Sequence, residues 1–89
     1  MSVVLVTYDL KTPGRIYTTF YDTLKSQGNW WHYLSTTWLI QTTKTPGQVY
    51  SALAPHITTN DLILVLPVTK PCFGWLPKDA WDWINAKIV

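Results

Sequence analysis

The chain has 89 residues, of which 47% are hydrophobic and 15% aromatic, and its net charge is only +2. This length predicts a single domain, and the mild charge lacks the clustered basic excess of a typical nucleic-acid-binding domain. A single cysteine, Cys72, excludes an intrachain disulfide and a cysteine-based zinc site. The chain has no apolar run of about 18 residues and no basic leader before its first apolar segment, so we expect a cytoplasmic protein without a membrane partner.

The first predicted elements are a strand and a helix. Val3–Tyr8 is β-branched and apolar on both faces, which is typical of a central strand, and Asp9 ends it. In the phrase KTPGRIY, Thr12 is a suitable helix N-cap. Pro13 fits the first helical position because its missing N–H would have no partner there. We therefore expect a helix to begin at Thr12-Pro13.

An apolar stripe predicts the body of this helix, and Gly28 is expected to stop it. Two strands should follow over Trp30–Leu34 and Thr37–Thr42, joined as a hairpin through residues 35–36. The stripe consists of Ile16, Phe20 and Leu24, with Tyr17 beside it.

The second half begins with nearly the same phrase as the first helix. KTPGQVY starts at Lys44, and it predicts a second helix that turns Val49 and Leu53 toward the core and ends at Pro55. After a polar turn, Leu62–Val68 reads as another strand that is apolar on both faces. Each copy of the phrase would thus open the crossover helix of one β-α-β unit.

Two β-α-β units predict an α+β fold, a ferredoxin-like βαββαβ sandwich over residues 1–68 with the strand order 4-1-3-2. Residues 69–89 exceed this unit and form a C-terminal extension of the same domain. Within it, Cys72–Trp75 is expected to be an extra edge strand or an extended arm, and Lys78–Lys87 a short helix. Such an extension commonly covers an open sheet edge, in its own subunit or in a partner's.

The strand order brings two carboxylates to one end of the sheet. Asp9 follows the first strand and Asp61 precedes the last one, so these neighbouring strands place them close together. The pair, or two Asp9 side chains across a dimer, would offer the oxygen ligands that Mg²⁺ prefers. The alternative is structural, with Asp9 as a strand terminator and Asp61 as a turn residue.

The remaining candidate binding residues are cations and tryptophans. Lys11 and Arg15 flank the predicted start of the first helix, where free amides favour a phosphate, and Lys44 has the same place before the second helix. Trp38 is expected in the core, whereas Trp31, Trp75 and Trp83 are expected at a protein interface or stacked on nucleic-acid bases.

The strand VVLVTYDL, a helix, Gly28 and an aromatic hairpin together resemble the small CRISPR-associated adaptation proteins. Tyr8-Asp9 matches the Tyr-Asp that ends their first strand, and Thr36 or Thr37 with Trp38 fits their third strand. The closing stretch GWLPKDAWDWI is more similar to their SinR-like relatives. The resemblance implies a ferredoxin-like homodimer, in whose nuclease members the aspartate that corresponds to Asp9 binds a divalent metal at the dimer axis.

These observations leave three functions open. The first is a homodimeric binding module of this type that presents a mildly basic surface to nucleic acid or a nucleotide. The second is a Mg²⁺-dependent endonuclease that uses Asp9. The third is a protein-interaction module with no nucleic-acid role, which the low charge and the six tryptophans favour.

Overall fold

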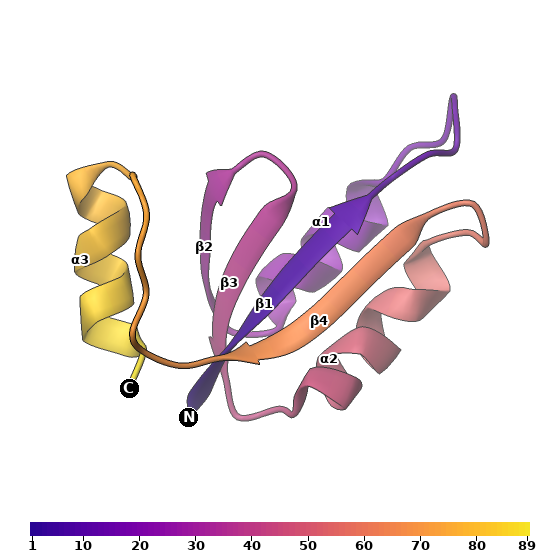
Figure 1. Cartoon of the computed structure of the whole chain (residues 1–89). Coiled ribbons are helices and arrows are strands. Elements are labelled where there is room, and N and C mark those ends of the chain that lie inside the picture. Colours follow the sequence, from indigo (N-terminus) through magenta and orange to yellow (C-terminus); the bar gives the residue numbers. More distant parts are fainter.

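The computed structural model describes all 89 residues, and it contains one four-stranded sheet and three α-helices (Figure 1). No helix is both long and apolar enough to span a membrane. In chain order the elements are β1 (Ser2–Asp9), α1 (Thr18–Ser26), β2 (Asn29–Leu34), β3 (Thr37–Thr42), α2 (Pro46–Leu53) with a following 3₁₀ turn η1 (Ala54–His56), β4 (Leu62–Val68) and α3 (Lys78–Lys87).

The sheet is antiparallel throughout, with the order β2-β3-β1-β4. β1 lies between β3 and β4, which confirms that the strand with two apolar faces is central. Its last residue, Asp9, pairs with Leu62 at the start of β4. The carboxyl end of β1 and the amino end of β4 therefore lie together, as the predicted order required.

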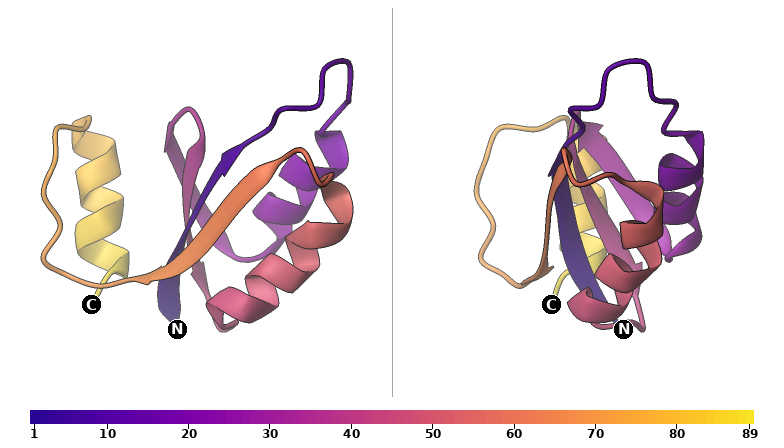
Figure 2. Two further views of the ribbon diagram at one scale, coloured as in Figure 1. Left: turned by 45° about the vertical axis from the view of Figure 1, so that its right-hand side comes forward. Right: turned by 90° about the vertical axis from the view of Figure 1, so that its right-hand side faces the viewer.

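Helices α1 and α2 cover one face of the sheet (Figure 2). Alternate residues of β1 point toward them because successive side chains of a strand face opposite sides. Val4 and Val6 are fully buried there beside Trp38 of β3, which confirms the prediction that Trp38 is a core residue. The helices contribute Phe20, Leu24, Val49 and Leu53.

Helix α3 packs on the opposite face and forms a second core (Figure 2). Ala80, Ile84 and Ile88 bury one side of the helix against Val3, Trp31 and Leu39. Residues 69–77, which lead to it, form an extended arm and no strand, so only the second of the two expectations for Cys72–Trp75 is realised. α3 contacts β2, and the outer strand β4 is left uncovered on this face.

The first KTPG phrase does not open a helix, contrary to the prediction. α1 begins at Thr18, and Thr12–Arg15 forms a tight turn in which Gly14 has a φ of +76° and Arg15 N donates to Thr12 O over 3.3 Å. A positive φ is accessible to glycine because it has no Cβ. Ile16 is consequently exposed outside the helix.

The second phrase does open α2, as predicted. Thr45 is the N-cap and accepts a hydrogen bond from Gln48 N, while the Gln48 side chain accepts one from Thr45 N, which completes a capping box. The first phrase has Arg15 at the position of Gln48. A guanidinium only donates hydrogen bonds, so Arg15 cannot accept from the cap amide, and the first phrase cannot form a capping box.

Candidate binding surfaces

Asp61 is a buried structural residue at the end of the sheet where β1 finishes. Its Oδ1 accepts hydrogen bonds from Tyr17 Oη at 2.7 Å and Lys11 N at 2.8 Å, and its Oδ2 accepts one from Thr58 N at 2.8 Å. Thr12 Oγ1 also lies 3.4 Å from Oδ1 and 2.7 Å from Thr58 Oγ1. The carboxylate thus joins the loop after β1 to the turn before β4.

Charge on Asp61 is stabilised by these donors. Burial alone acts to raise the pKa of its carboxyl, but the hydrogen bonds from Thr58, Tyr17 and the Lys11 amide outweigh it and lower the pKa to about 2. Both oxygens are occupied by donors of the chain itself. This arrangement corresponds to the structural interpretation of Asp61, as a turn residue, and not to a metal ligand.

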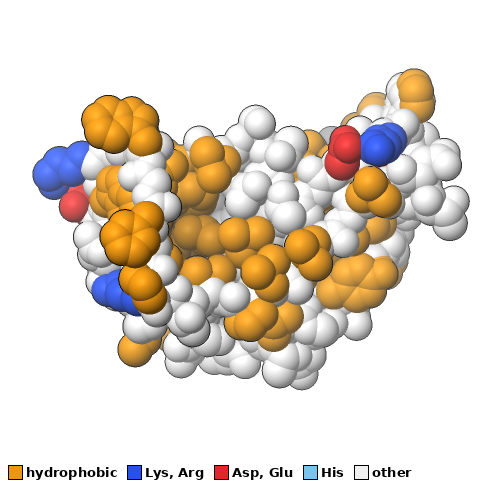
Figure 3. Space-filling model, viewed as in Figure 1, with side chains coloured by type: hydrophobic (Ala, Val, Ile, Leu, Met, Phe, Trp, Pro, Cys, Tyr) orange, Lys and Arg blue, Asp and Glu red, His pale blue; other side chains and the backbone are white.

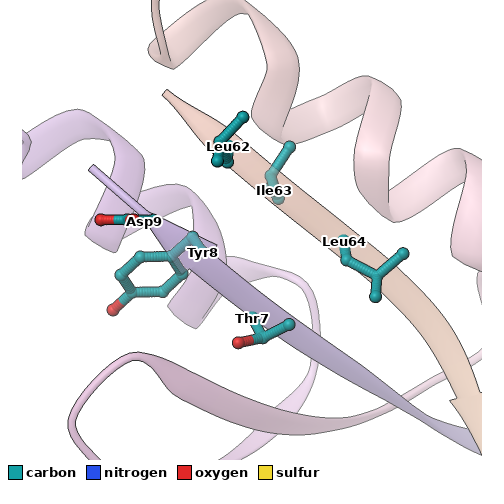
Figure 4. A pocket seen from close by; sticks show the side chains of 6 residues that line it. All are labelled: Thr7, Tyr8, Asp9, Leu62, Ile63 and Leu64. Carbon is teal, nitrogen blue, oxygen red and sulfur yellow. The ribbon is translucent and has the colours of Figure 1, made fainter. Parts of the chain in front are cut away.

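Asp9 lies exposed at the tip of β1, with Leu62 beside it on β4 (Figure 4). Its Oδ2 is 3.4 Å from Lys11 Nζ, in an exposed ion pair. A hollow of about 260 Å³ adjoins it, lined by Thr7, Tyr8, Asp9, Leu62, Ile63 and Leu64. Nowhere in the chain do three or more His, Cys, Asp or Glu side chains gather into a group that could hold a metal ion.

The three predicted phosphate-binding cations are not gathered in one place. Lys11 pairs with Asp9, and the Arg15 guanidinium donates to His56 O over 3.3 Å and lies 5.6 Å from the Tyr17 ring centre. Because α1 begins only at Thr18, neither residue flanks its first turn as expected. Lys44, before α2, donates to Gln27 Oε1 over 2.7 Å.

The predicted tryptophans divide between core and surface. Trp31 is only 3% exposed beneath α3, where Nε1 donates to Ala80 O, so its assignment to a binding surface was wrong. The alternation of side chains along β2 points Trp31 toward α3. The sequence around Trp31 does not indicate that this helix packs there. Trp75 of the arm is 99% exposed. Trp83 is partly buried and donates to Asn29 Oδ1 over 2.9 Å.

An apolar surface spreads over the face of the sheet that α3 leaves open (Figure 3). Leu62 and Leu64 of β4 are 57% and 59% exposed there, and Leu66 continues the row. Beside it, a hollow of about 160 Å³ between the sheet and the arm is lined by twelve residues, eleven of them hydrophobic. We call the three leucines with this hollow the open apolar face.

A third hollow, of about 340 Å³, lies at the other edge of the sheet between α1 and β2. Four of its five lining residues have aromatic rings. Trp38 stacks on His32 with ring centres 4.0 Å apart and planes at 14°, and Trp30 lies 5.2 Å from Trp38. The lining is completed by Tyr21 and Lys25 of α1.

Sequence reasoning missed this aromatic hollow, although its pattern was legible. Trp30 and His32 are two residues apart on a strand, and Tyr21 and Lys25 are four apart on a helix, so each pair shares one face. Only the docking of α1 against β2 brings the two pairs together.

Comparison of the chain with family models, curated proteins and solved structures found no match.

Proposed function

We propose that this chain is a small homodimeric binding module with a ferredoxin-like core, akin to the CRISPR-adaptation and SinR-like proteins that its sequence resembles. The fold part of the proposal is supported by the element order β-α-β-β-α-β before α3 and by the sheet order β4-β1-β3-β2. The functional part is supported by the surfaces that remain uncovered in a single copy.

The open apolar face is the observation that supports a dimer. Leu62, Leu64 and Leu66 form an exposed row on an edge strand, and Phe73 and Trp75 project from the arm with 91% and 99% of their surface exposed. Contiguous apolar surface of this kind on a small domain marks an interaction site. Tryptophan, here Trp75, is among the residue types that most often anchor such a site.

A second copy of the chain is the occupant that fits best. A twofold interface needs one patch that is complementary to itself, and this chain carries both a projecting aromatic arm and an apolar hollow next to the leucine row. Burying Phe73 and Trp75 would remove roughly 400 Å² from solvent. Repeated by symmetry, the arm accounts for about half of the roughly 1,600 Å² of a standard stable interface, and the leucine row and the hollow would supply the rest.

The nucleotide part of the proposal rests on the aromatic hollow, since the predicted cations do not form a basic patch. Lys11, Arg15 and Lys44 each have a partner within the chain. Lys25, in contrast, has no acidic partner, and its Nζ lies over the Trp30 ring. The endonuclease alternative, with Mg²⁺ on Asp9, stays a prediction of the sequence and gains no support from the surroundings of Asp9 described above.

Sedimentation equilibrium of the wild-type chain tests the dimer. We expect twice the monomer mass at micromolar concentration and a concentration-dependent dissociation. Leu64→Asp should raise the dissociation constant by about tenfold or more, because it places two charges in a desolvated contact. Thr19→Asp on the exposed side of α1 adds the same charge elsewhere and should leave the dissociation constant unchanged.

Circular dichroism of both variants would check that they fold. A wild-type chain that stays monomeric across this range would refute the dimer. A folded Leu64→Asp variant with unaltered association would remove the open apolar face as its interface.

A further inference from the structure

The aromatic hollow contains four rings, and the buried ring of Trp38 contacts the other three. Trp38 is buried, and its ring centre lies 6.5 Å from that of Tyr21, with planes at 26°, and 4.0 Å from that of His32, with planes at 14°. Trp30 is 43% exposed and stands beside Trp38 at 5.2 Å. The outer members of the group, Trp30 and His32, therefore present ring surface to solvent.

Two of the four rings are held in place by hydrogen bonds before any ligand arrives. His32 Nε2 lies 3.2 Å from Ser35 O, and because a carbonyl oxygen only accepts, this nitrogen carries the proton and donates it. Trp38 Nε1 donates to the Tyr8 hydroxyl oxygen over 3.0 Å. Fixed rings lose little conformational freedom on binding, which favours affinity.

One cation completes the hollow. Lys25 Nζ lies 5.6 Å from the centre of the Trp30 ring, and the side chain is exposed and in no ion pair. A cation already placed over Trp30 opposes the binding of a second cation, such as a methylated lysine, because like charges repel. It favours a ligand that combines a flat aromatic group with a negative charge.

We propose that the aromatic hollow is a stacking site for one nucleotide, with the base against Trp30 and His32 and the phosphate at Lys25. Base stacking on tryptophan is a general means of binding single-stranded nucleic acid. A volume of about 340 Å³ is at the lower end of the range for small-ligand sites, which suits a single nucleotide unit. The site lies within one protomer, so it rests on the nucleotide-binding part of the proposed function and not on the dimer.

The site accepts the same chemistry from two sources, a free nucleoside monophosphate or one unit of a single strand. Quenching of tryptophan fluorescence would report titration with thymidine monophosphate and with an oligothymidylate of about eight nucleotides. Binding of the oligonucleotide alone would assign the single strand as the source, and equal binding per nucleotide would assign the free nucleotide.

Substitutions identify the site. Trp30→Ala should weaken binding of the responding probe about tenfold, the usual effect of losing one stacked base, and Trp30→Phe should restore part of it. Lys25→Gln should reduce the salt dependence for the oligonucleotide by about 0.7 in log–log slope, as for one lost phosphate contact. Tyr50→Ala on α2 and Lys87→Gln remove an exposed aromatic ring and a lysine charge away from the hollow, and they serve as controls.

No binding of either probe by wild-type protein at low salt would overturn the proposal. So would wild-type affinity in both Trp30→Ala and Lys25→Gln, which alter exposed side chains and should keep the fold. In that second case the protein would still bind nucleotides, but not at the aromatic hollow. Sedimentation of the same variants separates this result from the dimer, since none of these hollow substitutions should change the mass.

Discussion

Tyr17 Oη donates a 2.7 Å hydrogen bond to Oδ1 of Asp61, between two residues that are 44 positions apart in the chain. Tyr17 immediately precedes α1, and Asp61 immediately precedes β4. This single bond therefore connects the start of the first helix to the start of the last strand. α1 itself begins at Thr18 without a side-chain cap.

Acid should weaken the fold through Asp61. Its folded pKa of about 2 lies below the ordinary value of 3.8, so its charge stabilises the folded state above pH 4 and this contribution is lost as the pH falls from about 4 to 2. Urea unfolding across this range should show the loss in the wild-type chain.

Asp61→Asn should flatten that part of the pH profile, because the titrating group is gone, and should lower stability at neutral pH. Asp22→Asn removes an exposed carboxyl on α1 and is the control. An Asp61→Asn profile that parallels the wild type between pH 4 and 2 would contradict the assignment.

The two KTPG phrases should differ in their sensitivity to an exchange of the residue that follows each. Gln48→Arg removes one hydrogen bond of the capping box and should destabilise the chain by about 0.5–1 kcal/mol, measured by thermal unfolding. Arg15→Gln should change stability by less than about 0.5 kcal/mol, because the first phrase is a surface turn. Equal losses from both would show that the first phrase also acts as a helix cap.

Two glycines should tolerate alanine very differently. A Cβ at Gly28 would collide with the backbone carbonyl of Gln41 on β3, so Gly28→Ala must part β2 from β3 and should cost about 1–3 kcal/mol or more. Gly47 in α2 has no neighbour closer than Thr45 Oγ1 at 3.9 Å. Gly47→Ala should therefore stabilise by about 0.4–1 kcal/mol. Chemical denaturation of the two variants checks the sign, and a neutral Gly28→Ala would contradict this packing.

Local pattern predicted the four strands and the core beneath α1 and α2. The β-branched run of β1 had to lie between two neighbours, because both of its faces are apolar. Phe20 and Leu24 were found on the buried side of α1 by their spacing alone. Gly28 was predicted only as a helix stop. A glycine is required there because the backbone carbonyl of Gln41 leaves no room for a Cβ.

Identical letters did not predict identical structure in the KTPG pair. Gln48 accepts a hydrogen bond and Arg15 does not, at the position that directly follows KTPG in each copy. The partner that decides the first phrase, Asp61, is remote in sequence, and no local rule contains it. The same hydrogen bonds occupy the Asp61 carboxylate, which the sequence predicted as a metal ligand.

The order of elements, the central position of β1 and the site of the second helix cap follow from hydrophobic periodicity and capping chemistry, which act between near neighbours in the chain. The side of the sheet taken by α3, the burial of Trp31, the engagement of Asp61 and the meeting of Lys25 with Trp30 depend on contacts between distant segments. Such contacts exist only once the chain has packed, because the side-chain surfaces that select them belong to separate elements.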